Sequence, residues 1–571
     1  MKLLNETRMR SLGVFITLAL ISLAFLKTAW VSEDAYITFR SIDNFLSGYG
    51  LRWNIDERVM VFTHPLWMLL LTPFIALIKS EFTVALILSY VLTMLSAWIL
   101  CVKVAQTNWG SVFVGIALAS SLSFASFSSS GLENPLIHFL VATSIWRLST
   151  GSREASEEGL FWGLWLALSF LTRPDAVLIF LPMTIYASMQ CQPGSWRMFG
   201  RWVIVGLAPA MVWTLFATIY FGSPLPNTFY AKAVSGIAYS ENITYGLFYL
   251  YWSTLHDPAG GALIVGATLL GLRSSHWAKP LAFSTLTYCF YLIWIGGDFM
   301  AGRFTSALVI LSVGSLLSYE GAKPKLSKAL TALACVALLG MLAMHKAPIA
   351  IPSNYYDQND EWGHHYRTNG LLGSNRNKGD ASSFHYQLGA FARNLFKEQV
   401  PNSEHMQGII GTIVFCSVGQ FGKAAGPHVR IIDPLGLTDP FLSHLPGRQW
   451  IPGHIVRPLP YGYATAIAFG DPSKLSPALL RLWKDVELAY RSDNLFTSER
   501  MVAIWRLNTG EGASVAQESG YSHMLTEIPY PPMNDCAPPN GKYYFWILNR
   551  EESELAALRA LHSSLRSNRN G

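Results

Sequence analysis

The chain contains few charged residues and few cysteines for its length. Charged side chains make up 14% of the 571 residues, whereas hydrophobic residues make up 51%, a balance that indicates a membrane protein rather than a soluble one. The sequence contains no Cys-x-x-Cys or His-Glu-x-x-His spacing, so it has no recognisable metal-ligand motif, and it contains no Gly-rich nucleotide-binding loop. The formal charge of +6 is modest, and the basic residues lie mostly in short connections, so we expect no bound nucleic acid.

The first apolar run delivers two carboxylates to the far side of a membrane. Residues Ser11–Trp30 are almost wholly apolar and reach the length of about 20 residues that a bilayer requires. The flank before this run contains three basic residues, so it is expected to stay in the cytoplasm. We interpret the run as a retained anchor, because no small-residue cleavage site follows it. Glu33 and Asp34 come directly afterwards and are therefore predicted at the outer membrane surface.

Further apolar runs predict a polytopic α-helical protein with about 11 transmembrane helices. The runs after the first are Phe82–Ala105, Ser111–Ser128, Pro135–Trp146, Gly159–Leu171, Ala176–Met189, Trp202–Phe221, Gly261–Leu272, Pro280–Ile295, Phe304–Ser318 and Ala329–His345. Basic residues fall in every second connection, which places those connections in the cytoplasm. This register requires that His64–Ile78 does not cross but lies in the outer interface. The alternative, an ordinary span, would place the connection at residues 147–153 outside.

On this topology the outer face collects the segments that are richest in ionisable and turn-forming residues. They are residues 33–63, 129–134, 172–175, 223–260, 296–303 and everything after about residue 346. Ionisable groups at helix ends on one face indicate a shared polar site. The alternative is that each group caps its own helix or extends its polar end to the interface.

The C-terminal part contains no run long enough to span a membrane. We expect a transmembrane domain at residues 1–346, whose first outer loop covers residues 31–81, and a soluble domain at residues 347–571. Short apolar segments at residues 408–415 and 429–432 indicate a single α/β domain. Cys416 and Cys536 are the two cysteines in this part. An oxidising compartment favours a disulfide between them, and the alternative is two free thiols.

Several motifs, spread in order over nearly the whole chain, resemble one family. They are Asp34-Ala35-Tyr36-Ile37-Thr38-Phe39-Arg40, Thr63-His64-Pro65-Leu66-Trp67, Gly131-Leu132-Glu133, Arg173-Pro174-Asp175, Pro226-Asn227-Thr228-Phe229-Tyr230-Ala231-Lys232, Gly297-Asp298-Phe299-Met300-Ala301-Gly302-Arg303, Ile432-Asp433 to Asp439-Pro440, and Gly453-His454 with Arg457. Together they resemble the terminal arabinofuranosyltransferases of mycobacterial and corynebacterial cell walls. A related group glycosylates type IV pilins in Gram-negative bacteria. One departure is Glu33, where the family often has a second Asp.

The resemblance implies a GT-C fold with a multi-pass domain in the bacterial inner, or plasma, membrane. It implies that the active site and the C-terminal α/β domain lie on the periplasmic side, where that domain shapes the acceptor groove. The implied donor is polyprenyl-phosphate-arabinofuranose, held beside the membrane lipid, and the implied acceptor is a cell-surface glycan or a pilin. The sequence identifies no cofactor. A divalent cation held by the carboxylates is compatible with the sequence, which does not demand one.

The residues suggest roles in such a transfer. Asp34, with Glu33 beside it, is the candidate catalytic carboxylate, acting as a base or beside an oxocarbenium-like centre. Guanidinium groups match phosphate oxygens. The candidates for binding the donor phosphate are Arg40, Arg303, His64 and Lys232. The candidates for orienting these cations or for binding the sugar or acceptor are Glu133, Asn227, Asp298, Asp433, His454 and Arg457.

Two other functions fit parts of the pattern. The first is a transferase of the same fold that uses another lipid-linked sugar, such as mannose or aminoarabinose. The second is a transporter for a lipid-linked sugar, which would show internal repeats and polar or broken helices near the bilayer midplane. The ionisable residues here collect at one interface instead, on the same side as the large soluble part, and this arrangement favours an enzyme.

Overall fold

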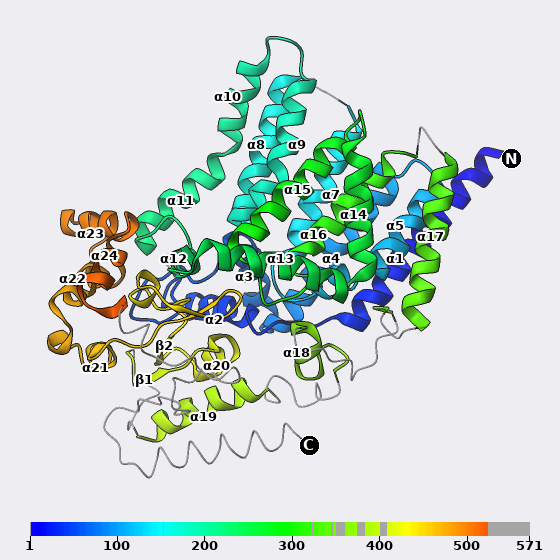
Figure 1. The fold of residues 1–571 in the computed structure, drawn as a ribbon. Coiled ribbons are helices and arrows are strands. Elements are labelled where there is room, and N and C mark those ends of the chain that lie inside the picture. The colour runs from blue at the N-terminus through cyan, green and yellow to red at the C-terminus, as the bar shows by residue number, and fades with distance from the viewer. Residues whose placement is uncertain are drawn as a thin grey trace. The chain divides into compact units, whose positions relative to one another are not determined.

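The chain folds into two compact units, each assembled from segments that are distant in the sequence (Figure 1). The computed structural model describes residues 2–151, 154–233, 236–320, 324–343, 347–349, 360–373, 383–399 and 408–522. The first unit comprises Met1–Ser32, His64–Val212 and Tyr239–Asn377, and the second comprises Glu33–Thr63, Trp213–Ala238 and Lys378–Gly571. The units are divided along the chain differently from the expected linear boundary near residue 346, because residues 33–63 belong to the second unit.

The named secondary-structure elements in the described residues of the first unit are all helices. Its helices are α1 (Lys2–Thr28), α3 (Pro65–Ile78), α4 (Glu81–Ile99), α5 (Asn108–Ser120), α6 (Leu122–Phe127), α7 (Asn134–Ser149), α8 (Ala155–Thr172), α9 (Val177–Gln190), α10 (Trp196–Gly206), α13 (Tyr239–His256), α14 (Pro258–Leu272), α15 (Ala278–Ile295), α16 (Thr305–Leu317), α17 (Pro324–Ala343) and α18 (Glu361–Asn369). Helix α11 (Ala208–Phe221) contributes to both units. Short 3-10 or π-helical turns in the two units lie at Leu100–Val104, Pro174–Ala176, Leu442–His444, Pro472–Lys474 and Glu487–Arg491.

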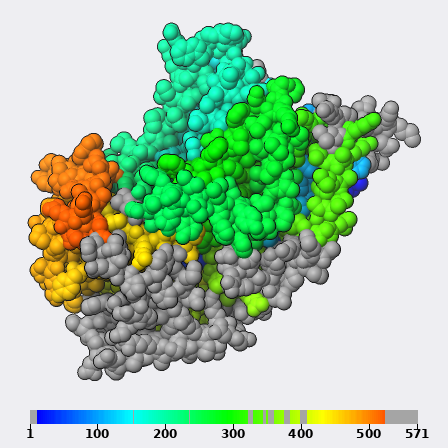
Figure 2. All heavy atoms as spheres, viewed as in Figure 1, coloured from blue at the N-terminus to red at the C-terminus, as the bar shows by residue number. Residues whose placement is uncertain are grey.

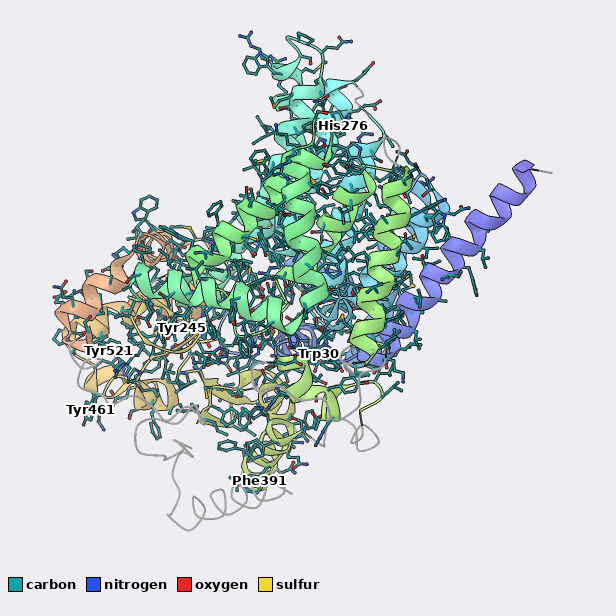
Figure 3. The ribbon with its side chains drawn as sticks, turned by 45° about the vertical axis from the view of Figure 1, so that its right-hand side comes forward. Trp30, Tyr245, His276, Phe391, Tyr461 and Tyr521 are labelled. Carbon is teal, nitrogen blue, oxygen red and sulfur yellow. The ribbon has the colours of Figure 1, made fainter. Side chains whose placement is uncertain are left out.

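Helix α16 is the centre of the first unit. All of its residues from Thr305 to Leu317 are buried, as expected for a helix that is apolar all round. It packs against α7, α14 and α15. At the junction after α1, the buried Trp30 (labelled in Figure 3) donates its indole N–H to the carbonyl oxygen of Ser126 over 2.9 Å. This contact ties the end of the first apolar helix to the bundle.

The apolar helices differ in how well they suit a membrane crossing. Among the described residues, Ser11–Thr28 and Glu81–Val104 are long and apolar enough by themselves. The pairs α10–α11 and α13–α14 also qualify if each is one span, although they bend by 42° and 115°. Shorter apolar helices are Pro65–Ile78, Asn108–Ser120, Thr305–Leu317 and Lys328–Leu342. The count of about 11 spans, and the placement of α3 in the interface, stay predictions.

The second unit contains both helices and strands. Its helices are α2 (Ala35–Leu46), α12 (Asn227–Ala233), α19 (Phe384–Gln399), α20 (Val418–Ala425), α21 (Tyr463–Phe469), α22 (Pro477–Val486), α23 (Ser498–Asn508) and α24 (Glu511–Glu518). The strands β1 (Gly411–Val414) and β2 (Val429–Ile432) pair in parallel, with Ile413 opposite Ile431. Helix α20 lies between them in the sequence. The strands β3 (Arg448–Ile451) and β4 (His454–Val456) form an antiparallel pair. Strands β1 and β2 lie within the two short apolar segments, at residues 408–415 and 429–432, that indicated an α/β domain.

A buried carboxylate explains why residues 33–63 join the second unit. Glu57 is 2% exposed, and its Oε2 lies 2.8 Å from Nη2 of Arg430 on β2 and 3.1 Å from Nη2 of Arg491. Its Oε1 accepts a hydrogen bond from the side chain of Asn54 over 2.9 Å. A buried carboxylate requires such partners, so this loop is held by the residues around β2.

Candidate functional site

A buried carboxylate in the first unit is shared by three basic side chains. The side chain of Glu133 has no exposed surface, and its Oε2 lies 2.9 Å from Nδ1 of His64. Its Oε1 lies 3.3 Å from Nη1 of Arg173 and 3.5 Å from Nη2 of Arg303. We call these four residues, together with Asp175, Asp298 and Tyr288, the Glu133 cluster. Its members come from segments far apart in the sequence, so folding has brought ionisable groups to one place.

Helix ends position the cluster. His64 directly precedes α3, Glu133 directly precedes α7, and Arg173 directly follows α8. The turn before α7 contains Gly131, whose φ of +75° favours glycine. The carbonyl oxygen of Gly131 accepts a hydrogen bond from the indole of Trp67, on the first turn of α3, over 2.9 Å. The start of α3 is therefore held beside the start of α7.

Arg173 is held by carboxylates on two sides. Its Nε and Nη2 donate to the two oxygens of Asp175 over 3.1 and 2.9 Å, in a fork that suits a carboxylate. The hydroxyl of Tyr288 on α15 donates to Oδ2 of Asp175 over 2.7 Å. The guanidinium carbon of Arg173 also lies 4.1 Å from the centre of the Phe304 ring. Arg173 is therefore fixed in orientation within the unit.

Arg303 makes longer ion pairs than Arg173. Its Nη2 lies 3.5 Å from Glu133, and its Nη1 lies 3.6 Å from Oδ2 of Asp298 and 3.7 Å from the sulfur of Met300. These distances exceed the 2.7–2.9 Å or so of a strong charge-assisted hydrogen bond. The side chain of Arg303 is 12% exposed. Of the two arginines beside Glu133, Arg303 is the one whose guanidinium can exchange a carboxylate for another anion at lower cost.

The cluster keeps Glu133 ionised. Burial by itself raises the pKa of Glu133, but the nearby His64, Arg303 and Arg173 outweigh burial and hold this pKa below its ordinary value. Burial by itself lowers the pKa of the Arg173 guanidinium. The nearby Asp175, Tyr288 and Glu133 outweigh burial and raise this pKa above its ordinary value. With His64 protonated, three cations face Glu133, Asp175 and Asp298. The cluster then has no net charge, so an added phosphate must replace a carboxylate contact.

The structure brings together four residues that the sequence singled out and adds others. His64, Glu133, Asp298 and Arg303 all belong to the cluster. The sequence analysis did not propose roles for Arg173, Asp175 or Tyr288. The signal for the first two was present in the Arg-Pro-Asp motif. Tyr288 lies inside an apolar run, and only its contact with Asp175 identifies it.

The proposed catalytic carboxylates lie in the second unit. Asp34 directly precedes α2, and Glu33 accepts a hydrogen bond at its Oε1 from the backbone N–H of Gln420 over 3.0 Å. Both side chains are partly buried. Glu33 is thus fixed by α20. The catalytic role of Asp34 stays a prediction.

Arg40, a candidate for the donor phosphate, is directed at backbone carbonyls. It is 2% exposed. Its Nε donates to Trp53, its Nη1 to Gly422 and its Nη2 to Val429, over 2.9, 2.8 and 2.8 Å. The guanidinium also stacks on the ring of Trp53 at 4.3 Å. These contacts join α2 to α20 and β2 and fit a structural role, so we do not include Arg40 in the function proposed below.

Three of the predicted sugar-binding or acceptor-binding residues form one buried network. Asn227 donates its amide to the carbonyls of Gly436 and Leu437 over 2.8 and 3.1 Å. Asp433 accepts backbone N–H groups of Leu435 and Leu437 over 2.9 and 2.8 Å. The network also includes Arg457, which donates to the carbonyls of Leu435, Leu445, Ile455 and Ala231. These side chains shape the turn at residues 433–440, and a direct contact with sugar stays a prediction.

The remaining predicted residues are Lys232, His454 and the two cysteines of the C-terminal part. Lys232 is exposed on α12, and His454 is partly buried at the start of β4. Cys416 takes part in a disulfide, whereas Cys536, its expected partner, lies outside the described residues. Within the part of the chain that the structure describes, no group of three or more His, Cys, Asp or Glu side chains is arranged to hold a metal ion.

Two curated proteins are similar to part of this chain. A terminal beta-(1->2)-arabinofuranosyltransferase from Corynebacterium glutamicum is 28% identical over 318 residues, which cover 48% of this chain and 46% of that protein. A protein of the same name from Mycobacterium tuberculosis is 27% identical over 244 residues, which cover 38% of this chain and 37% of that protein. No family model matches the chain, and no solved structure matches it significantly.

These relatives confirm the resemblance that the motifs indicated. The chain is related to terminal arabinofuranosyltransferases over about half of its length, and the match spans less than half of either relative. Arabinofuranose transfer is the activity named for both relatives. Those names say nothing of the donor lipid, the acceptor or the catalytic residue.

Proposed function

We propose that this protein is a membrane glycosyltransferase that transfers arabinofuranose from a polyprenyl-phosphate donor to a periplasmic acceptor, either a cell-surface glycan or a pilin. The observation that carries the proposal is the Glu133 cluster, taken together with the names of the two relatives. Such a donor already carries a phosphate leaving group, so the enzyme needs cations for that phosphate and a carboxylate for the acceptor.

The Glu133 cluster is suited to the donor phosphate. Arg303 offers a planar guanidinium, and its ion pairs with Glu133 and Asp298 are long enough to be exchanged for phosphate oxygens. His64 adds a second cation when it is protonated. Glu133 and Arg173 then act as positioning residues, because they keep His64 and Arg303 in place before the donor arrives.

Asp34 is the proposed catalytic carboxylate. In the transfer, an acceptor hydroxyl forms a bond to the anomeric carbon of arabinofuranose, and the bond between that carbon and the phosphate oxygen breaks. Polyprenyl phosphate leaves with the bonding electron pair, and Asp34 accepts the proton of the hydroxyl. Alternatively, Asp34 stabilises positive charge at the anomeric carbon. Glu33 is already engaged with α20 and is assigned a supporting role.

We place the reaction on the outer face of the bacterial inner membrane. The proposal can be checked with cysteines introduced at Ser514 on α24 and at Glu157 on α8, both of which are exposed. The four free thiols are first replaced by alanine. An impermeant thiol reagent applied to intact spheroplasts should label position 514 and spare position 157. The reverse pattern would place the C-terminal part in the cytoplasm.

Transfer by the purified protein in proteoliposomes tests the activity directly. The donor is polyprenyl-phosphate-arabinofuranose with a radiolabelled sugar, and the acceptors are arabinan oligosaccharides and pilin. Polyprenyl-phosphate-mannose is the competing donor. We expect arabinose to be incorporated covalently and mannose to be rejected. Transfer of mannose alone would replace arabinose in the proposal, and movement of labelled donor across the bilayer without transfer would indicate a transporter.

A further inference from the structure

Helix α13 buries several polar side chains and exposes several large apolar ones. The buried face carries Gly246, Tyr249, Ser253 and His256 at helical spacing. The opposite face carries exposed large apolar residues, which are Ile243, Leu247, Phe248, Tyr251 and Leu255, between 40% and 59% exposed. A helix at a water-facing surface shows the reverse pattern. Atoms of this part of the first unit form an outer surface in Figure 2.

Two threonines on the exposed face of α13 form hydrogen bonds within the helix. Thr244 donates its hydroxyl to the carbonyl of Ser240 over 2.9 Å, and Thr254 donates to the carbonyl of Leu250 over 2.8 Å. Both hydroxyls therefore bond within the helix, as polar groups in contact with lipid must. No charged residue occurs between Asn242 and Leu255. This face is therefore suited to an apolar medium along most of its length.

Helix α13 runs in a very different direction from α14, which follows it. It meets α14 at a bend of 115°, and α14 is an apolar helix with N-terminal cap Asp257. Asp257 accepts hydrogen bonds from Gly260 N–H over 2.9 Å and from Ser121 Oγ over 2.5 Å, so the corner is fixed. If α14 crosses the bilayer, a helix bent away from it so strongly lies closer to the membrane plane. The label of Tyr245 in Figure 3 marks this helix.

The buried face of α13 holds the loop that ends in Arg303. The hydroxyl of Tyr249 donates to the carbonyl of Met300 over 3.3 Å and accepts the N–H of Phe304 over 3.1 Å. Ser253 Oγ accepts the N–H of Gly302 over 3.2 Å. At Gly297, whose φ is +70°, an added Cβ would lie 2.4 Å from Cβ of Tyr249. The close approach of loop and helix therefore depends on glycine at position 297.

We propose that α13 is an interfacial helix, with its exposed face in the outer leaflet and its buried face holding the residue 297–303 loop at the level of the lipid headgroups. Membrane lipid is the partner of the exposed face. Tyr249 and Ser253 are positioning residues for Arg303. The role of Arg303 towards a donor phosphate rests on the function proposed above. The contact of α13 with lipid and its contact with the loop are independent of that function.

Spin-label accessibility tests the lipid contact in the full chain reconstituted in lipid nanodiscs. Nitroxides are attached through a ketone-bearing amino acid at Leu247 and Tyr251, so that native cysteines are untouched. Val91, exposed on the candidate span α4, is the control within the bilayer, and Ser514 on α24 is the control in water. We expect positions 247 and 251 to collide with oxygen more than with a nickel chelate, at a shallower depth than position 91.

Four results would overturn the placement of α13 in the lipid interface. Accessibility like that of Ser514 would mean that α13 faces water, and protection from both reagents would mean that protein covers it. A depth equal to that of Val91 would mean that α13 crosses the membrane. A shift in accessibility only after addition of arabinan oligosaccharides would assign the aromatic face to a glycan instead.

A matched pair of variants tests the loop contact. Tyr249→Phe removes the hydroxyl that touches the loop, whereas Tyr251→Phe removes an exposed hydroxyl on the other face. With a nitroxide at Phe299, the first variant should raise the mobile spectral component by about tenfold through loss of two hydrogen bonds, and the second should leave it unchanged. Equal spectra for both variants would refute the positioning role. Neither readout uses turnover, so failure here is distinguishable from failure of the proposed transferase activity.

Discussion

Nδ1 of His64 lies 2.9 Å from Oε2 of Glu133, and neither side chain is more than 6% exposed. The other oxygen of the Glu133 carboxylate faces Arg173 and Arg303. Burying a carboxylate among cations costs little folding free energy only while all of these charged partners are present. The pair therefore couples the folding stability of the first unit to the proposed binding of phosphate.

Replacing Glu133 with glutamine should affect both stability and donor use. Glu133→Gln leaves the surrounding cations uncompensated, so we expect the unfolding free energy to fall by about 3–5 kcal/mol and the donor KM to change. The matched control is Glu158→Gln, which breaks another buried pair, with Arg147 at 2.9 Å. That control should lower the melting temperature without changing the donor KM. Equal effects on KM would remove the cluster from donor binding.

The two arginines of the cluster should respond differently to lysine. Arg303→Lys keeps the charge but loses the planar fork, so we expect the donor KM to rise by about tenfold while the melting temperature stays near that of the parent. Arg173→Lys breaks the fork on Asp175 and should cost about 2 kcal/mol of stability. Donor titrations and melting curves on the same preparations measure both effects. A donor KM that is unchanged in Arg303→Lys would end the phosphate assignment.

Removal of the charge at Asp34 should slow transfer most. Asp34→Asn keeps the size and polarity of the side chain, and we expect kcat to fall by at least about 100-fold, the low end of the contribution of a positioned acid or base. Glu33→Gln should have a smaller effect, because glutamine can still accept the N–H of Gln420. The measurement is single-turnover transfer at saturating donor. Near-normal turnover in a folded Asp34→Asn protein would remove this residue from the mechanism.

The turn at Asp433 should make stability depend on pH. Burial raises the pKa of Asp433 from 3.8 to about 7, against the opposing effect of backbone N–H groups. Between these values the folded chain holds a proton that the unfolded chain has lost, so stability should fall as the pH rises. In Asp433→Asn, the loss of unfolding free energy between pH 5 and 7.5 should be smaller than in the parent by roughly 1–3 kcal/mol.

Exposed Asp471 provides the control for this pH dependence, because Asp471→Asn should leave the parental slope in place. Melting temperatures measured across the pH range report the slope for each variant. A parental stability that instead rises with pH would show that the N–H donors of the turn outweigh burial and keep Asp433 ionised.

Much of the first unit follows from local sequence. The expected runs are helical over their described residues, although Ser111–Ser128 is divided between α5 and α6 at Ser121, and Trp202–Phe221 between α10 and α11 at Leu207. The expected outer-face segment at residues 223–260 contains α13, which the sequence analysis did not predict. Tyrosine, threonine and serine interrupt its apolar pattern. Only the structure shows that Tyr249 and Ser253 point inward while both threonines bond to their own helix.

The sequence by itself determined that the chain has apolar helices and that ionisable motifs follow or precede them, because hydropathy and charge are properties of single residues and short windows. Tertiary structure alone decided which groups each arginine contacts. Arg40 and Arg457 donate to backbone carbonyls, whereas Arg303 faces carboxylates at longer distances. The guanidinium group is the same in each, and its partners come from segments far away in the chain. The cost of redirecting each arginine therefore depends on contacts that no local pattern contains.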